Sequence, residues 1–81
     1  MKKGDLITGT LIGFNYVGKE VKYCRITVAV GDKTYRTILG TAEVFPFSAM
    51  LSLKGAGAQA SMTYTDDNEY GPVFNDVEFK L

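Results

Sequence analysis

Strict alternation over residues 21–30 constrains the fold of this chain more than any other feature. The two sides carry different residues: Cys24, Ile26, Val28 and Val30 on one, and Tyr23, Arg25, Thr27 and Ala29 on the other. Because successive side chains of a β-strand point to opposite faces, we predict a strand with the first set in the core and the second on an outer face. Related patterns occur along nearly the whole chain, which predicts an all-β protein.

Four further strands are predicted, at residues 6–14, 34–39, 58–65 and 73–81. The first contains Gly9 and Gly13, and glycines inside a strand indicate the bends that curl a sheet into a barrel. In the last two strands the apolar sides are expected to hold Ala58, Ala60, Met62 and Tyr64, and Val73, Val77, Phe79 and Leu81. Turn-forming or strand-breaking residues separate the strands at 15–20, 31–32, 66–68 and 71–72.

The segment between the third and fourth predicted strands is not a regular strand. Residues 41–54 contain Pro46, which interrupts a strand or helix, and Ser48, which is predicted to cap one short helical turn that ends at Gly55. Five strands with such a connection after the third fit a small Greek-key barrel of the OB-fold type. An SH3-like barrel is the alternative, because the sequence does not determine the strand order.

The chain is expected to form a single OB-like domain over residues 1–81, with a modest core. Its one cysteine, Cys24, lies in an apolar run and is expected to be a buried thiol without a disulfide partner. The absence of a disulfide and of a recognisable signal peptide predicts a cytoplasmic protein that does not engage a membrane.

No catalytic or cofactor site is predicted. The chain has no histidine to act as a base, and residues 55–57 lack the spacing of a phosphate-binding loop, so we expect neither an enzyme nor a cofactor. Residues 66–78 are acidic, but they lack the glycine and glutamate spacing of a calcium loop. They are therefore interpreted as a polar turn without a metal.

Charge is divided between the two halves of a chain that is neutral overall. Residues 1–40 carry seven cations and three anions, a net charge of +4, whereas residues 41–81 carry two cations and six anions, a net charge of −4. The basic half also contains aromatic residues at positions 14, 16, 23 and 35. Cations interleaved with aromatics are typical of single-stranded nucleic-acid sites, where phosphates need charge and unstacked bases need flat rings.

Eight residues of the basic half are predicted to bind nucleic acid. They are Phe14, Tyr16, Lys19, Lys22, Tyr23, Arg25, Tyr35 and Arg36. The tyrosines are expected to stack on bases and the cations to neutralise phosphates, on the second and third strands that bind oligonucleotides in OB-folds. Tyr35 and Arg36 are adjacent and must point to opposite faces, so only one of them can join this surface.

Three features of the chain stand out together: a small all-β body, a basic aromatic hairpin at residues 14–25 and the C-terminal segment 68–81. In these features the chain resembles the single-stranded DNA-binding proteins of filamentous phages. That last segment, Asn68-Glu69-Tyr70-Gly71-Pro72-Val73-Phe74-Asn75-Asp76-Val77-Glu78-Phe79-Lys80-Leu81, joins an aromatic-glycine turn to a closing strand that carries an aspartate. The resemblance implies an OB-like barrel, a two-fold homodimer and cooperative coating of single-stranded replication intermediates with little sequence preference, in the cytoplasm of a host cell if phage-encoded. The acidic second half departs from these basic proteins, so either the affinity for DNA is lower than theirs or the acidic residues face away from the DNA groove.

A second hypothesis assigns the function to that acidic half. In it, the chain is a small β-barrel adaptor or inhibitor that binds a protein partner through residues 66–78, which would mimic nucleic acid. Charge reversal at Lys19, Lys22 and Arg25 would abolish the first function, whereas neutralising Asp66, Asp67 and Glu69 would abolish the second.

Overall fold

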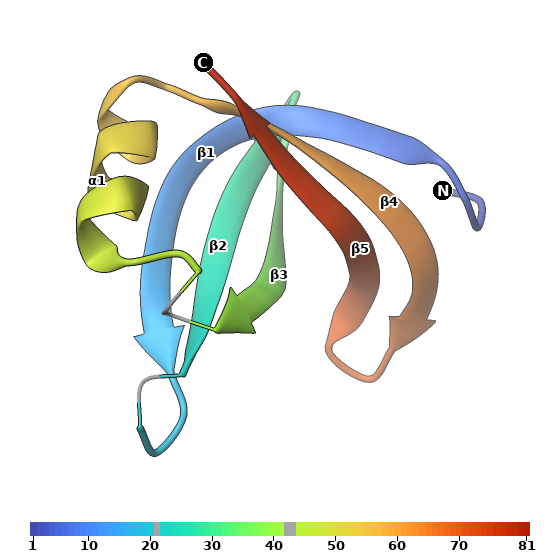
Figure 1. The fold of residues 1–81 in the computed structure, drawn as a ribbon. Coiled ribbons are helices and arrows are strands. Elements are labelled where there is room, and N and C mark those ends of the chain that lie inside the picture. The colour runs from blue at the N-terminus through green and yellow to red at the C-terminus, as the bar shows by residue number, and fades with distance from the viewer. Residues whose placement is uncertain (21, 42–43) are drawn as a thin grey trace.

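Five antiparallel strands form one sheet in the order β3-β2-β1-β4-β5 (Figure 1). The elements are β1 (Leu6–Val17), β2 (Tyr23–Val30), β3 (Lys33–Thr41), α1 (Phe47–Gly55), β4 (Gln59–Asn68) and β5 (Gly71–Lys80). The structure is a computed structural model that describes residues 1–20, 22–41 and 44–81. The predicted positions of residues 21, 42 and 43 therefore lie outside the described residues.

The strand order is that of a Greek key. Strands β1, β2 and β3 follow one another in the sheet, and β4 returns through the connection that holds α1 to lie on the other side of β1. This arrangement, 4-1-2-3, is the Greek-key order. The prediction of a small all-β, OB-like fold with a connecting segment after the third strand is confirmed. The order argues against the SH3-like alternative, in which β4 would continue the meander beside β3.

The long first strand is bent and pairs with two neighbouring strands. Leu6–Thr10 pair with β4 and Thr10–Val17 pair with β2, and Figure 1 shows the ribbon of β1 curving between them. Gly9 lies at this bend, where a Cβ atom would approach the Val28 Cγ1 atom to 2.6 Å. Only glycine fits there, which confirms the expected bend in this strand.

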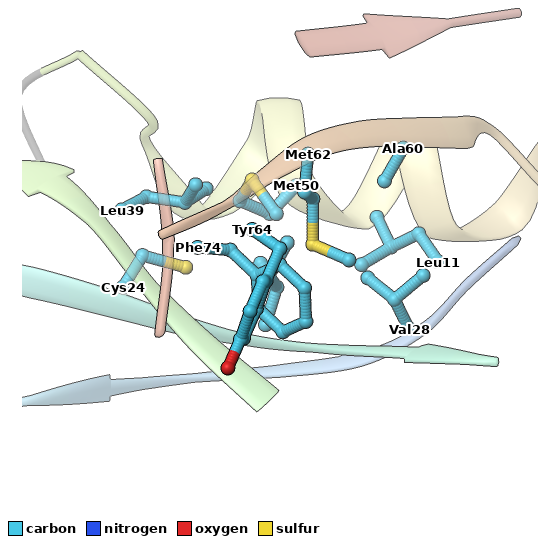
Figure 2. Packing of buried hydrophobic residues seen from close by; sticks show 10 residues of the cluster. Leu11, Cys24, Val28, Leu39, Met50, Ala60, Met62, Tyr64 and Phe74 are labelled. Carbon is cyan, nitrogen blue, oxygen red and sulfur yellow. The ribbon is translucent and has the colours of Figure 1, made fainter. Parts of the chain in front are cut away.

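The core lies between the strands, and α1 closes one end of it. Met50 of α1 is fully buried and packs with Leu11 of β1 and Met62 of β4 (Figure 2). The predicted inward sets of β2 and β4 are confirmed: Val30 is half-buried against the core, and the others are buried, namely Cys24, Ile26, Val28, Ala58, Ala60, Met62 and Tyr64. An alternating pattern was sufficient here because the register shifts opposite these residues place the additional residue in the partner strands β3 and β5.

Two bulges change which side chains face the core. In β1 the pairing with β2 shifts between Leu11 and Gly13, so the inward positions change from odd to even numbers and Ile12 is exposed. In β5 the pairing shifts opposite Ser61–Thr63, and Asp76 takes a positive φ of 53°.

The predicted apolar side of the last strand is therefore partly wrong. Phe74, and not Val73, is the buried residue at the start of β5, whereas Val77 and Phe79 pack against the core after the bulge. Leu81 follows the strand and is exposed. A regular alternation that starts at Val73 cannot give the correct facing both before and after the bulge, because the bulge reverses the side to which later residues of the strand point.

The helix and the last hairpin also differ from prediction. Ser48 is inside α1 and does not cap it; Pro46 precedes the helix in an extended conformation, and its carbonyl accepts the Met50 N–H at 3.1 Å. Residues 66–68 belong to β4, and the turn consists of Glu69 and Tyr70. Gly71 does not break the chain but begins β5 with a φ of 119°, a conformation that glycine adopts readily.

Candidate nucleic-acid interface

The two edge strands of the sheet approach each other without a hydrogen-bonded ladder, and an open groove of about 430 Å³ lies at this seam. Across the seam the Thr37 hydroxyl donates a hydrogen bond to the Phe74 carbonyl oxygen, with 3.4 Å between the oxygens. One wall includes Arg25, Arg36 and Ile38 from β2 and β3, and the other includes Asn68, Tyr70 and Pro72 from the β4–β5 hairpin. This face and this hairpin are where OB-folds bind oligonucleotides.

The two arginines reach the groove because of the β2–β3 register. Arg25 is opposite Ile38 and Thr27 is opposite Arg36, so both arginines lie on the outer face, at diagonal positions about 7–8 Å apart. The long side chains can therefore reach a common ligand. Within residues 1–20, 22–41 and 44–81, neither guanidinium forms an ion pair, which leaves both available to an anion.

Apolar and aromatic surface accompanies these cations. Tyr70 is 89% exposed at the tip of the hairpin, where its backbone N–H donates to the Asn68 Oδ1 atom at 2.8 Å. Ile38 is 51% exposed beside Arg25. Tyr23 is 49% exposed and precedes Arg25 by two positions on β2, on the same outer face. Two tyrosine rings are thus open to solvent next to the cationic wall.

Three of the predicted binding residues have a different environment. The bulge in β1 turns Phe14 and Tyr16 toward the core side, where the Phe14 ring lies 5.5 Å from that of Phe47. The Tyr16 hydroxyl donates to the Phe45 carbonyl oxygen at 2.6 Å. Tyr35 points inward as well, and its ring is 5.6 Å from that of Phe74.

The prediction that these aromatic residues share one surface with the arginines is therefore corrected. Phe14, Tyr16 and Tyr35 are half-buried and pack against the core, Phe14 and Tyr16 beside Phe47 at the start of α1 and Tyr35 beside Phe74. Arg36, and not its neighbour Tyr35, faces outward. The error has a physical cause: the bulge that reverses β1 leaves no clear mark in the spacing of its apolar residues.

Burial also sets the protonation of two groups near α1. Tyr16 is opposite Cys24 in the β1–β2 ladder. Desolvation raises the pKa of the Tyr16 phenol, and the neighbouring Cys24 raises it further. Desolvation raises the pKa of the Cys24 thiol too, while its hydrogen bond with Tyr16 partly offsets this. Cys24 is thus a protonated core residue at neutral pH, as expected for a buried thiol.

The two predicted lysines lie at and beside the β1–β2 loop, outside the groove. The Lys22 Nζ atom is 2.8 Å from the Glu20 Oε2 atom, and both side chains are well exposed. Such a surface pair contributes little stability, about 0–1 kcal/mol, but it offsets part of the local positive charge. Lys19 is exposed in the same loop. Of the predicted cations, Arg25 and Arg36 line the groove.

The acidic half contributes the hairpin that forms the second wall. Asp66, Asp67 and Glu69 are exposed and flank Asn68 and Tyr70, which line the groove. The Asp67 carboxylate is a hydrogen-bond partner of Tyr64, and this bond, more than burial, raises the pKa of the Tyr64 phenol. The hairpin that carries these acidic residues borders the groove.

Most of the residues that line the groove were absent from the predicted set, among them Ile38, Asn68 and Tyr70. Tyr70 stands between Glu69 and Gly71 in a turn, and an aromatic residue at such an exposed position is the signal that could have identified it. Ile38 lies in the edge strand β3 and Asn68 ends β4, beside the other edge strand, so no local pattern connects them.

Comparisons of the chain with protein-family models, curated proteins and solved structures gave no match. Within the described residues, no group of three or more histidine, cysteine, aspartate or glutamate side chains is placed to hold a metal ion. None of the helices described is long and apolar enough to cross a membrane.

Proposed function

We propose that this chain is a single-stranded DNA-binding protein of the OB-fold type that binds with little sequence preference. The observation that carries the proposal is the seam groove, which combines the exposed ring of Tyr70 with two arginines that form no ion pair among the described residues. Phosphates would bind Arg25 and Arg36, and a base would stack on Tyr70. Tyr23 and Lys19 would extend the contact toward the β1–β2 loop.

The shape of the site favours a single strand over a duplex. An open groove between a flat strand face and a hairpin can admit one chain of unstacked bases, whereas the base edges of a duplex are read by an element that enters its groove. Since none of these contacts is specific for one base edge, binding would depend on backbone charge and stacking. Such binding suits the coating of replication intermediates in the cytoplasm, and the homodimer implied by the phage resemblance remains a prediction.

The test is the fluorescence anisotropy of a labelled dT oligonucleotide at about 50 and about 200 mM salt, with duplex DNA as the comparison. We expect salt-sensitive binding of the single strand with quenching of tyrosine emission, and weaker binding of the duplex. The double variant R25Q/R36Q should lose most of this affinity, whereas the matched variant K33Q/K54Q, altered away from the groove, should retain it. Absence of binding at about 50 mM salt would reject the proposal, because electrostatic contacts are strongest there.

A protein-binding adaptor is the second candidate, and one observation favours it. Asp66, Asp67 and Glu69 are exposed around the prominent Tyr70 ring, a combination of charge and aromatic surface that suits a basic protein partner. Failure of the DNA test, followed by saturable binding of a basic peptide that D66N/E69Q abolishes, would favour this function.

A further inference from the structure

We infer that the groove engages only a short stretch of a single strand, about two to three phosphates, and that the acidic hairpin sets this limit. The inference depends on the proposed function and specifies the ligand of the same groove. A footprint of this size would be shorter than that of a protein whose nucleic-acid channel is lined by a continuous row of cations.

A strand bound in the groove can contact only a small number of cations on the described surface. Arg25 and Arg36 are the two cations that line the groove, and Lys19 lies outside it, in the β1–β2 loop toward which a bound strand would extend. Lys22 is paired with Glu20, and Lys33 begins β3 at the far end of the strand from Ile38. A strand that lies across the outer face therefore meets about two to three positive charges.

The opposite wall of the groove, formed by the β4–β5 hairpin, carries negative charge. Asp66 and Glu69 are exposed on either side of Asn68, and no described cation forms an ion pair with either carboxylate. The Debye length is about 10 Å at 0.1 M salt, so these carboxylates act on any phosphate carried past the hairpin. Phosphates beyond the arginine pair would be repelled, and a longer strand would gain no further contact on this side.

Base stacking would supply a large share of the binding free energy. If few phosphates are neutralised, the exposed rings of Tyr70 and Tyr23 must supply a large part of the affinity, at about 1–3 kcal/mol for each stacked base. The logarithm of the binding constant of a single strand falls with the logarithm of salt with a slope of about −0.7 for each phosphate neutralised. Two to three phosphates correspond to a slope between about −1.4 and about −2.1.

The experiment measures this slope for the wild-type chain with dT oligonucleotides of increasing length. A slope no steeper than about −2.1 that stays constant from short to long strands supports the inference. A steeper slope, or one that steepens with length, overturns it. If no oligonucleotide binds at all, the proposed function fails; if binding occurs with a steep slope, only the short footprint fails.

The acidic limit is tested by D66N/E69Q, which leaves Asp67 and its hydrogen bond with Tyr64 in place. We expect about fivefold tighter binding of long strands at low salt and a steeper slope. The control D32N/E78Q makes the same change in net charge, at the β2–β3 turn and toward the end of β5. Equal gains in the two variants would show that only net charge matters, and would reject a role for the hairpin.

Discussion

Arg25 and Arg36 are diagonal neighbours on the outer face of β2 and β3, because Arg25 is opposite Ile38 while Arg36 is opposite Thr27. This register brings two guanidinium groups to the seam groove without any intervening carboxylate partner among the described residues. The hairpin that faces them is acidic, so the groove has walls of opposite charge. The arrangement makes the arginine pair the first target for mutation.

Replacing either arginine by glutamine should weaken binding of single-stranded DNA at low salt and reduce the salt slope by about 0.7. Each guanidinium lies on an outer face, so the fold should be retained, which circular dichroism can check. Lys33→Gln is the matched control, because it removes one positive charge at the β2–β3 turn. An unchanged slope in both arginine variants would contradict the assignment of phosphate contacts to this pair.

Tyr70→Ala should weaken binding by about 1–3 kcal/mol, whereas Tyr70→Phe should bind nearly as well, because stacking needs the ring and not the hydroxyl. Its ring is almost fully exposed, so neither change should alter the midpoint of urea unfolding by much. Titration with a dT oligonucleotide gives the affinities. Equal losses in the two variants would implicate the hydroxyl instead.

Tyr16→Phe should lower stability without weakening DNA binding, in contrast to the changes at Tyr70. It removes the hydrogen bond to the Phe45 carbonyl and should lower the free energy of unfolding by about 1 kcal/mol, with no effect on DNA affinity. Urea unfolding and the same oligonucleotide titration measure the two quantities. A clear loss of affinity in a folded Tyr16→Phe protein would restore this residue to the binding site.

Gly9→Ala should destabilise the fold by at least about 2 kcal/mol, because the new methyl group would collide with β2. Gly40→Ala is the control, since a Cβ there meets no other atom within 4 Å. Thermal unfolding of the two variants gives the comparison. Similar melting temperatures would show that β1 can shift away from β2 at its bend.

Stability should fall as the pH rises above about 9. The ordinary pKa of a cysteine thiol is 9.0, and burial raises that of Cys24 in the folded state. Above pH 9 the unfolded chain loses this proton while the folded chain keeps it, so the unfolded state binds fewer protons and becomes favoured. Tyr16 and Tyr64, whose ordinary pKa is 10.0 and is likewise raised by folding, add to the effect at higher pH.

Urea unfolding between pH 7 and pH 10.5 measures this dependence. Cys24→Ala should unfold more easily at pH 7, because it leaves a small cavity, but it should lose less stability between pH 8.5 and pH 9.5 than the wild-type chain. If the two proteins show the same pH dependence in that interval, the thiol is not the group that titrates.

The sequence by itself determined the local structure of this protein where a repeating pattern is uninterrupted. The alternation of apolar and polar residues determined which sides of β2 and β4 are buried, and glycine marked the bend of β1 and the turn between β2 and β3. These features depend on neighbours within a few positions, so they can be read along the chain.

Only the tertiary structure decided where the candidate site lies. The bulge in β1 turns Phe14 and Tyr16 to the core side, and the bulge in β5 does the same for Val77 and Phe79, because one additional residue in a ladder moves every later side chain to the other face. The groove joins Arg25 and Arg36 to a hairpin more than thirty positions away, at the edges of β3 and β5. Those edges meet because β4 pairs with β1 and bends the sheet around its core, a long-range contact that no local pattern encodes.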